Sequence, residues 1–342
     1  MPLGYVLKTE QVLAYYGLER EDVAEAIFKY GVDRKVIMTT EPGTLGGGGG
    51  QNGFRSPDEI LSQAQEALEG MEGTVPRRYP AFHGTLARLP TDRRFMRRGQ
   101  KGADLVMDID VKGDYKEAFR DGRKILDFLD SYNAPYRVKF SGGSGPHIII
   151  PYEAFPESLS GGRFDRAHKL LFQIVTSRSR ASHVDGSFTS TGHFYRMPYS
   201  LNEITGLVSL PLTREQYDDF TPSMAEVPNV QVDDNWFREP DEEAREALME
   251  ILRDNTGRSR DFADIVRPDR RSEDSAGVVL PGSRAVPQVP DRFVLEKMQK
   301  RIERQVQRLK RLGETQAQEE LIRKEEQKLR EAMEELERKK HE

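Results

Sequence analysis

Two aspartates separated by one residue are the first candidates for chemistry in this chain. Asp108 and Asp110 end the run Leu105–Asp110 (LVMDID). If this run is a β-strand, its side chains alternate between two faces, so both carboxylates project from one face while the apolar residues point into a core. Neighbouring carboxylates repel unless one is protonated or a cation neutralises them, and oxygen ligands suit Mg²⁺ or Mn²⁺. The pattern indicates a metal site, although an exposed strand end with two solvated acids has the same sequence.

A glycine-rich turn follows further along the chain. Tyr136–Phe140 and His147–Ile150 have the composition of strands, and Ser141–Pro146 (SGGSGP) between them predicts a β-hairpin. The small residues of the turn leave backbone N–H groups and two hydroxyls accessible to phosphate oxygens, with His147 at the start of the second strand. The alternative is a simple turn with a hydrogen-bonded edge histidine.

A third segment, Ser182–Leu212, supplies a further carboxylate and a cation. Asp185 follows the apolar Val184, and Phe194–Met197 has the composition of a strand that carries Arg196. Leu207–Leu210 predicts another strand. This segment can therefore complete an acidic site that the first segment begins.

In this order, the three segments resemble the archaeo-eukaryotic primase superfamily. DLVMDID is similar to the family's acidic strand, SGGSGPHIIIP to its SGxxGxH turn, and VDGSFTSTGHFYRMPYSLNEITGLVSLPL to its third block. The likeness is to the small catalytic subunit of replicative primases and, more distantly, to the polymerase domains of bacterial end-joining ligases. It extends upstream through Tyr79–Leu89 and Glu21–Met38 and covers residues 10–215. The blocks are specific in combination and weak singly.

The resemblance implies a DNA-templated nucleotidyltransferase that synthesises or extends primers by two-metal-ion catalysis. Its expected substrates are NTPs or dNTPs and a single-stranded or primed DNA template. By the same resemblance, Asp108, Asp110 and Asp185 would hold two Mg²⁺ or Mn²⁺ ions. The residues expected to bind the incoming triphosphate are Ser141, Gly142, Gly143, Ser144, Gly145, His147 and Arg196. A gap-filling repair polymerase, a metal-dependent nuclease and a non-catalytic replication subunit are the alternatives.

The sequence departs from the family's pattern at two positions of the third block. Asn202 stands in place of the usual histidine, and Ile204 in place of the lysine before Thr205. Both departures weaken contacts carried over to these positions. The chain also has no cysteine, so it lacks the ligands of a Cys-based zinc knuckle, and no zinc is expected.

Charge and composition favour a protein inside the cell. The 342 residues are 36% hydrophobic and 32% charged, with a net charge of −5. A secretory leader and a membrane-spanning run are both missing from the sequence, so we expect a cytoplasmic protein, nucleoid-associated if the source is prokaryotic. Local cations contrast with the net charge and favour contact with a nucleic-acid backbone, a solvated basic loop being the alternative. They are Arg93, Arg94, Arg97, Arg98 and Lys101 before the acidic strand, and Arg137 and Lys139 beside the turn.

The order of elements predicts an α+β fold. Single amphipathic helices over Tyr115–Tyr132 and Arg163–Ser177 separate the strands, which indicates a mixed sheet with the three segments on one face. We expect a primase-polymerase catalytic domain over 1–220 and an irregular or helical extension and linker over 221–290. Trp236 in the extension would pack back onto the domain. A charged helical hairpin or coiled coil over 291–342 would dock to a protein partner or to itself.

Overall fold

The computed structural model describes residues 4–41, 51–71, 73–89, 101–155, 162–186 and 192–256. The chain divides into two units, Met1–Pro268 and Asp269–Glu342. The predicted helical tail over 291–342, the linker beyond residue 256 and the arginines between 93 and 98 lie outside the described residues. Every described helix and strand belongs to the first unit.

The described part confirms the α+β prediction, because helices alternate with antiparallel strands along it. Its longer helices are α2 (Glu21–Gly31), α3 (Asp58–Ala67), α4 (Tyr115–Asp130), α5 (Gly162–Ser179) and α7 (Glu242–Thr256); shorter ones are α1 (Thr9–Leu13) and α6 (Arg214–Asp218). The strands are β1 (Lys35–Thr39), β2 (Gln51–Asn52), β3 (Ala81–Thr85), β4 (Ala87–Arg88), β5 (Gly102–Ala103), β6 (Leu105–Asp108), β7 (Arg137–Phe140), β8 (Pro146–Ile150), β9 (Phe194–Arg196) and β10 (Pro211–Leu212). Among the described helices, none is long and apolar enough to cross a bilayer.

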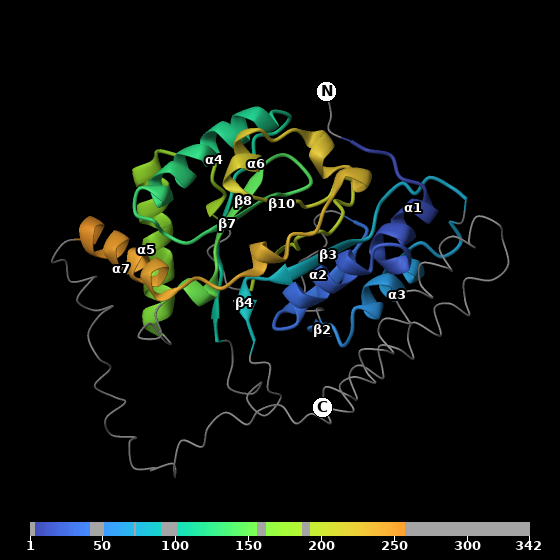
Figure 1. Cartoon of the computed structure of the whole chain (residues 1–342), viewed down its shortest axis with the longest axis horizontal. Helices are drawn as coiled ribbons and strands as arrows, with labels where there is room; N and C mark the ends of the chain where they lie inside the picture. Colours follow the sequence, from blue (N-terminus) through green and yellow to red (C-terminus); the bar gives the residue numbers. More distant parts are fainter. Residues whose placement is uncertain are drawn as a thin grey trace, which may run out of the picture. The chain divides into compact units, whose positions relative to one another are not determined.

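These strands form two four-stranded sheets and a short ribbon. One sheet has the order β2-β1-β3-β9, the other β10-β7-β8-β6, and β4 pairs with β5. In Figure 1, α2 and α3 lie beside the first sheet, and α4 and α5 lie beside the second. The second sheet carries both the acidic strand and the glycine hairpin, so it organises the candidate site.

Helix α4 forms where the sequence predicts it and covers the second sheet. Asp114 caps its first turn by accepting the backbone N–H of Glu117 at 3.0 Å. Ala118, Ile125 and Leu129 recur on one face and are fully buried. The stripe fixes the helix over the strands that carry the site.

One predicted strand is wrong in its extent. Leu207–Leu210 was expected to join a sheet, but only Val208 forms a bridge there, to Leu201, and the sheet strand begins at Pro211. Gly206 has φ +68°, which closes a tight local turn. The chain after this turn pairs mainly with the residues just before it, through Ser209, and it reaches the sheet only at Leu210, whose carbonyl accepts the N–H of Phe140 at 2.8 Å.

The extension after residue 220 packs on the same core as far as residue 256. Trp236 is 8% exposed, and its indole N–H donates to the carbonyl of Val138 at 3.0 Å. On α7, Leu248 and Ile251 are buried. The predicted anchoring role of Trp236 is confirmed.

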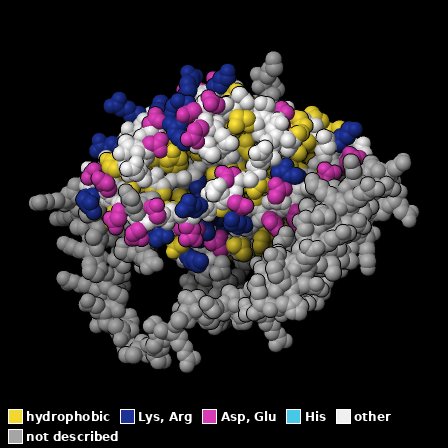
Figure 2. All heavy atoms as spheres, viewed as in Figure 1, with side chains coloured by type: hydrophobic (Ala, Val, Ile, Leu, Met, Phe, Trp, Pro, Cys, Tyr) yellow, Lys and Arg dark blue, Asp and Glu magenta, His cyan; other side chains and the backbone are white. Residues whose placement is uncertain are grey.

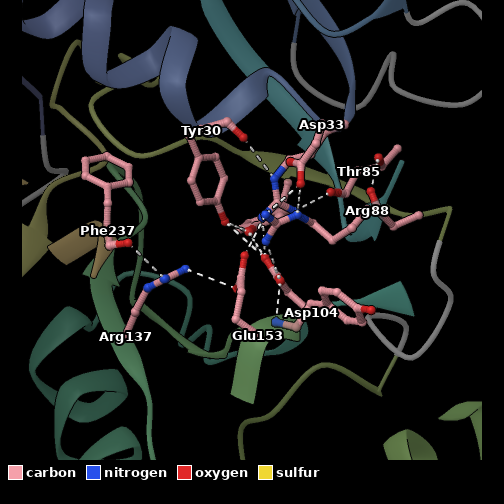
Figure 3. A network of polar contacts seen from close by, with 12 residues as sticks. Tyr30, Asp33, Thr85, Arg88, Asp104, Arg137, Glu153 and Phe237 are labelled. Atoms are coloured by element: carbon pink, nitrogen blue, oxygen red, sulfur yellow. Dashed lines mark hydrogen bonds and ion pairs between the residues drawn. The ribbon is translucent and has the colours of Figure 1, made fainter. Parts of the chain in front are cut away.

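A buried network of charges joins the two sheets (Figure 3). Arg34, which precedes β1, is fully buried, and its guanidinium lies 2.5 Å from the carboxylate of Asp104, next to β6. Arg88 of β4 pairs with Asp33 at 2.7 Å, with Asp104 at 3.3 Å and with Glu153 at 2.7 Å. Buried charges are tolerated only when they are paired and hydrogen-bonded, so these segments are held in one arrangement.

Candidate active site

A row of polar side chains crosses the second sheet. Lys139 of β7 lies directly opposite His147 of β8, and His147 lies directly opposite Asp108 of β6. The ammonium of Lys139 is 2.9 Å from Nδ1 of His147, and Nε2 of His147 is 3.3 Å from Oδ1 of Asp108. Directly opposite residues of antiparallel strands share a face, so the cation, the imidazole and the first acid form one continuous line.

The third predicted acid joins the end of this row through backbone pairing. Ile109 forms an antiparallel bridge with Val184. The backbone N–H of Asp185 donates to the carbonyl of Asp108 at 2.8 Å, and that of Asp110 donates to the carbonyl of His183 at 3.2 Å. This register puts Asp185 opposite Asp108, and the alternation of side chains puts Asp110 on the same face. Asp185, which is distant in sequence, thus meets Asp108 and Asp110 on one ribbon.

The acids have the ligand chemistry of a hard divalent cation, but their side chains do not converge on one point. Asp110 and Asp185 are exposed, and the side chain of Asp108 is 22% exposed. Within the described ranges, no group of three or more His, Asp or Glu residues is arranged to hold a metal ion. The backbone therefore provides a shared face with suitable oxygen donors, and their grouping around one ion would require rotation of the side chains.

Hydrogen bonds to the side chain of Ser141 stabilise the glycine turn. The hydroxyl of Ser141 accepts the backbone N–H groups of Gly143 at 3.2 Å and Gly145 at 3.5 Å. Ser141 is 7% exposed, so its hydroxyl points into the turn. The half-buried Gly143 and Ser144 form the accessible part. Ser141 was predicted to bind phosphate, but in this structure its hydroxyl instead accepts hydrogen bonds within the turn.

Gly145 sets the distance between the turn and the acidic strand. A β-carbon at this position would lie 1.9 Å from the carbonyl oxygen of Ile109 and 2.9 Å from Cβ of Ala118. Only glycine allows the hairpin to approach so closely. The contact fixes the turn beside the acids.

Replacing Gly145 by alanine is expected to destabilise the fold by about 1–3 kcal/mol, because the added methyl group has to displace backbone. Thermal or denaturant unfolding measures this. Gly192 provides the matched control, since a β-carbon there meets nothing within 4 Å, and Gly192→Ala should leave stability unchanged. Equal stability of the two variants would contradict the close approach.

Arg196 and His83 belong to the first sheet, and the sequence predicted only Arg196 as a site residue. They lie directly opposite each other on β9 and β3. Arg196 pairs with the buried Glu203 and donates to the carbonyl of Ser141 at 2.7 Å. Within the described part, Nε of Arg196 and Nδ1 of His83 are buried without a hydrogen-bond partner. Unsatisfied buried nitrogens are rare and indicate a place for a ligand or water.

His83 was not predicted as a site residue, and Lys139 was predicted only as a contact to a nucleic-acid backbone. His83 is 3% exposed in β3. The only signal in the sequence for a role of this residue is that a histidine stands within an otherwise apolar strand. The pairing of its strand with the strand of Arg196 could not be read from the chain.

Burial controls the protonation of the row. It lowers the pKa of His147 to about 4, with the charge of Lys139 adding to the effect, so the imidazole is neutral at pH 7. Burial, helped by Arg196, also holds the pKa of Lys139 well below its usual range. Burial by itself would raise the pKa of Asp108, but the adjacent His147 and Lys139 lower it. Asp108 is therefore ionised, and Nε2 of His147 carries the proton that faces it.

Two cations predicted to contact a nucleic-acid backbone cannot do so. Lys139 is fully buried, and the side chain of Arg137 is 9% exposed, with bonds to the carbonyls of Phe237 and Arg238. Their strand β7 lies inside its sheet, between β10 and β8. The prediction was wrong because it assumed an open face. On the face seen in Figure 2, Lys and Arg side chains are interspersed with Asp and Glu.

The two departures in the third block have different consequences. Asn202 is buried, and its side-chain oxygen accepts the backbone N–H groups of Ile204 and Thr205, both at 2.9 Å. Thr205 in turn donates its hydroxyl to the carbonyl of Gly142 at 2.6 Å. Asn202 thus shapes a turn that supports the glycine turn, whereas Ile204 is 53% exposed.

Comparisons with known proteins give a distant structural likeness. The chain is similar to the polymerase domain of Mycobacterium tuberculosis Ligase D, solved in complex with DNA, with 17% identity and a TM-score of 0.43 over 75% of this chain and 92% of that one. No family model and no curated protein matches the sequence. At this identity and TM-score, the likeness assigns neither a family nor an activity.

Proposed function

We propose that this protein is a metal-dependent nucleotidyltransferase that synthesises or extends a nucleic-acid strand on a DNA template. The observation that carries the proposal is the pairing of the Asp185 segment with Asp108–Asp110, next to a glycine turn held in contact with the same strand. Carboxylates beside a phosphate-sized turn are the parts that phosphoryl transfer requires.

In this proposal Asp108, Asp110 and Asp185 hold Mg²⁺ or Mn²⁺ through their carboxylate oxygens. A bound ion would activate the attacking hydroxyl and offset the charge that develops on the phosphates. The ionised state of Asp108 at neutral pH supports this role.

The triphosphate would lie against the accessible Gly143 and Ser144 and near Arg196. The side chain of Arg196 is 12% exposed, its buried Nε has no hydrogen-bond partner among the described residues, and guanidinium–phosphate hydrogen bonds are strong. His147 would offer its Nε2 proton to a phosphate oxygen once Asp108 engages an ion. Electrostatic positioning of this kind is the main protein contribution to phosphoryl transfer.

Strand-growth assays test the proposal. The full-length protein is incubated with labelled single-stranded DNA, with primed DNA and with gapped duplex, with NTPs or dNTPs and Mg²⁺ or Mn²⁺. Growth without a primer identifies priming, growth on primed DNA identifies extension, and growth on the gapped duplex alone identifies gap filling. Shortening of the strand would identify a nuclease and overturn the proposal, as would the lack of growth on every substrate.

Lys139→Met is expected to weaken nucleotide binding without harming the fold. Among the described residues no Asp or Glu forms an ion pair with Lys139, which bonds only to His147 and, at 2.7 Å, to the hydroxyl of Ser209. Removing this buried amino group takes away the donor to Nδ1 of His147, which keeps the imidazole proton on Nε2, so KM for the nucleotide should rise about 10-fold or more, equivalent to about 1.4 kcal/mol. Thermal stability should be equal or higher, because a buried charge is exchanged for an apolar side chain of similar size.

Steady-state kinetics and thermal unfolding measure the two effects of Lys139→Met. Lys116→Met, on the exposed face of α4, removes one positive charge elsewhere and should change neither. An unchanged KM for Lys139→Met would remove Lys139 from the nucleotide site.

A further inference from the structure

A buried carboxylate on α4 lies behind the segment that carries Asp185. The side chain of Asp121 is 0% exposed, on a helix face whose other buried residues are apolar or small. A buried carboxylate is costly unless hydrogen bonds compensate it. The groups that it bonds therefore indicate what it holds in place.

Asp121 bonds the backbone of a distant segment. Its Oδ2 accepts the backbone N–H groups of Ser182 at 2.8 Å and His183 at 2.7 Å. The ring nitrogen Nδ1 of His183 lies 3.3 Å from the same oxygen, and Lys124 donates to Oδ1 at 2.7 Å. One carboxylate thus binds two consecutive amides and is itself neutralised from its own helix.

The residues that follow these amides pair at once with the acidic strand. The carbonyl of His183 accepts the N–H of Asp110, Val184 bridges Ile109, and the N–H of Asp185 donates to Asp108. The amides bonded by Asp121 and the residues paired with the acidic strand follow one another directly in the chain, so no unpaired residues separate them. A slip of one residue would turn Asp185 to the opposite face of the ribbon.

We propose that Asp121 is a positioning residue that sets the register of residues 182–185 and thereby keeps Asp185 beside Asp108 and Asp110. This inference rests on the proposed metal-dependent function. Asp121 itself touches neither substrate nor metal. Its effect passes through the backbone of Ser182 and His183 to the third acid.

The test compares Asp121→Ala with the parent protein by Mn²⁺ binding and by hydrogen exchange of the peptide that contains Asp185. Loss of the hydrogen bonds between Asp121 and the two amides should weaken Mn²⁺ binding about 10-fold, as removal of supporting groups does at other metal sites. Exchange at Asp185 should accelerate, because its bond to Asp108 opens more often. If Asp121→Ala does not fold, Asp121→Ser, which keeps a polar group in the space, takes its place with the same expected results.

Two further variants separate positioning from general damage to α4. Asp114→Ala removes the carboxylate that caps this helix, which among the described residues accepts the N–H of Glu117, and should cost stability without changing Mn²⁺ affinity. Asp121→Asn retains a side-chain oxygen for the two amides, so it should keep most of the affinity. If Asp121→Asn loses as much Mn²⁺ affinity as the alanine variant, the charge of Asp121 matters rather than its hydrogen bonds to the two amides. That result would overturn the inference.

The two proposals fail in distinguishable ways. If Asp185→Ala weakens Mn²⁺ binding but the Asp121 variants bind as tightly as the parent, the positioning role is wrong and the proposed function stands. If the parent protein binds no Mn²⁺ and grows no strand, the proposed function is wrong. Hydrogen exchange at Asp185 then still decides whether Asp121 sets the register, and unchanged exchange in its variants would overturn that too.

Discussion

The Asp108→Ala/Asp110→Ala protein is expected to lose nucleotide incorporation by about 1000-fold or more while remaining folded. The two acids lie on the ribbon that also holds Asp185, and removing them would leave one proposed carboxylate ligand of three. Metal-assisted charge stabilisation contributes several kcal/mol to such reactions, and about 4 kcal/mol corresponds to this loss of rate.

The fold should tolerate this double substitution, because Asp110 is exposed and the side chain of Asp108 is 22% exposed at the end of its strand. Single-turnover incorporation and Mn²⁺ binding by calorimetry measure the effect, and thermal unfolding checks the fold. Glu66→Ala/Glu69→Ala removes two carboxylates from an exposed region at the end of α3 and should incorporate nucleotide normally. Polymer formed equally well by the Asp108→Ala/Asp110→Ala protein would end the proposed mechanism.

Asp104→Ala is expected to destabilise the protein by about 3–5 kcal/mol, the cost of leaving a buried charge without its partner. Arg34 is fully buried, and its guanidinium forms an ion pair with the carboxylate of Asp104. Asp104→Ala would also remove the contact between Arg88 and Asp104. Urea unfolding at pH 7 measures the free energy of unfolding.

The same variant has a defined dependence on pH. Burial by itself would raise the pKa of Asp104, but the guanidinium groups of Arg34 and Arg88 outweigh it and lower the pKa well below its usual range. A lowered carboxylate pKa contributes stability above the unfolded value near pH 4, and this stability is lost as the pH falls toward the folded value. The difference between parent and variant should be complete at pH 7 and shrink below about pH 4.

Asp127→Ala is the control for Asp104→Ala. Asp127 pairs with Arg214 at 2.8 Å, but its side chain is 60% exposed. Exposed ion pairs contribute about 1 kcal/mol at most. Similar losses in Asp104→Ala and Asp127→Ala would mean that the buried network does not hold the sheets together.

The sequence by itself determined most of the described elements and predicted the acidic residues of the candidate site. Alternation placed Asp108 and Asp110 in a strand, which the structure ends at Asp108, and the apolar stripe defined α4 nearly to the residue. The run of small residues after Phe140 fixed a hairpin. These features are local, because each depends on side-chain periodicity or turn chemistry within a few residues.

Only the tertiary structure decided which distant groups meet and which of them are buried. It brought Asp185 to Asp108 and Asp121 to the backbone of Ser182. It also buried Lys139, which the sequence suggested as a surface cation. Strand order and the covering of faces set these outcomes, and both depend on pairings between segments far apart in the chain, which local periodicity does not encode.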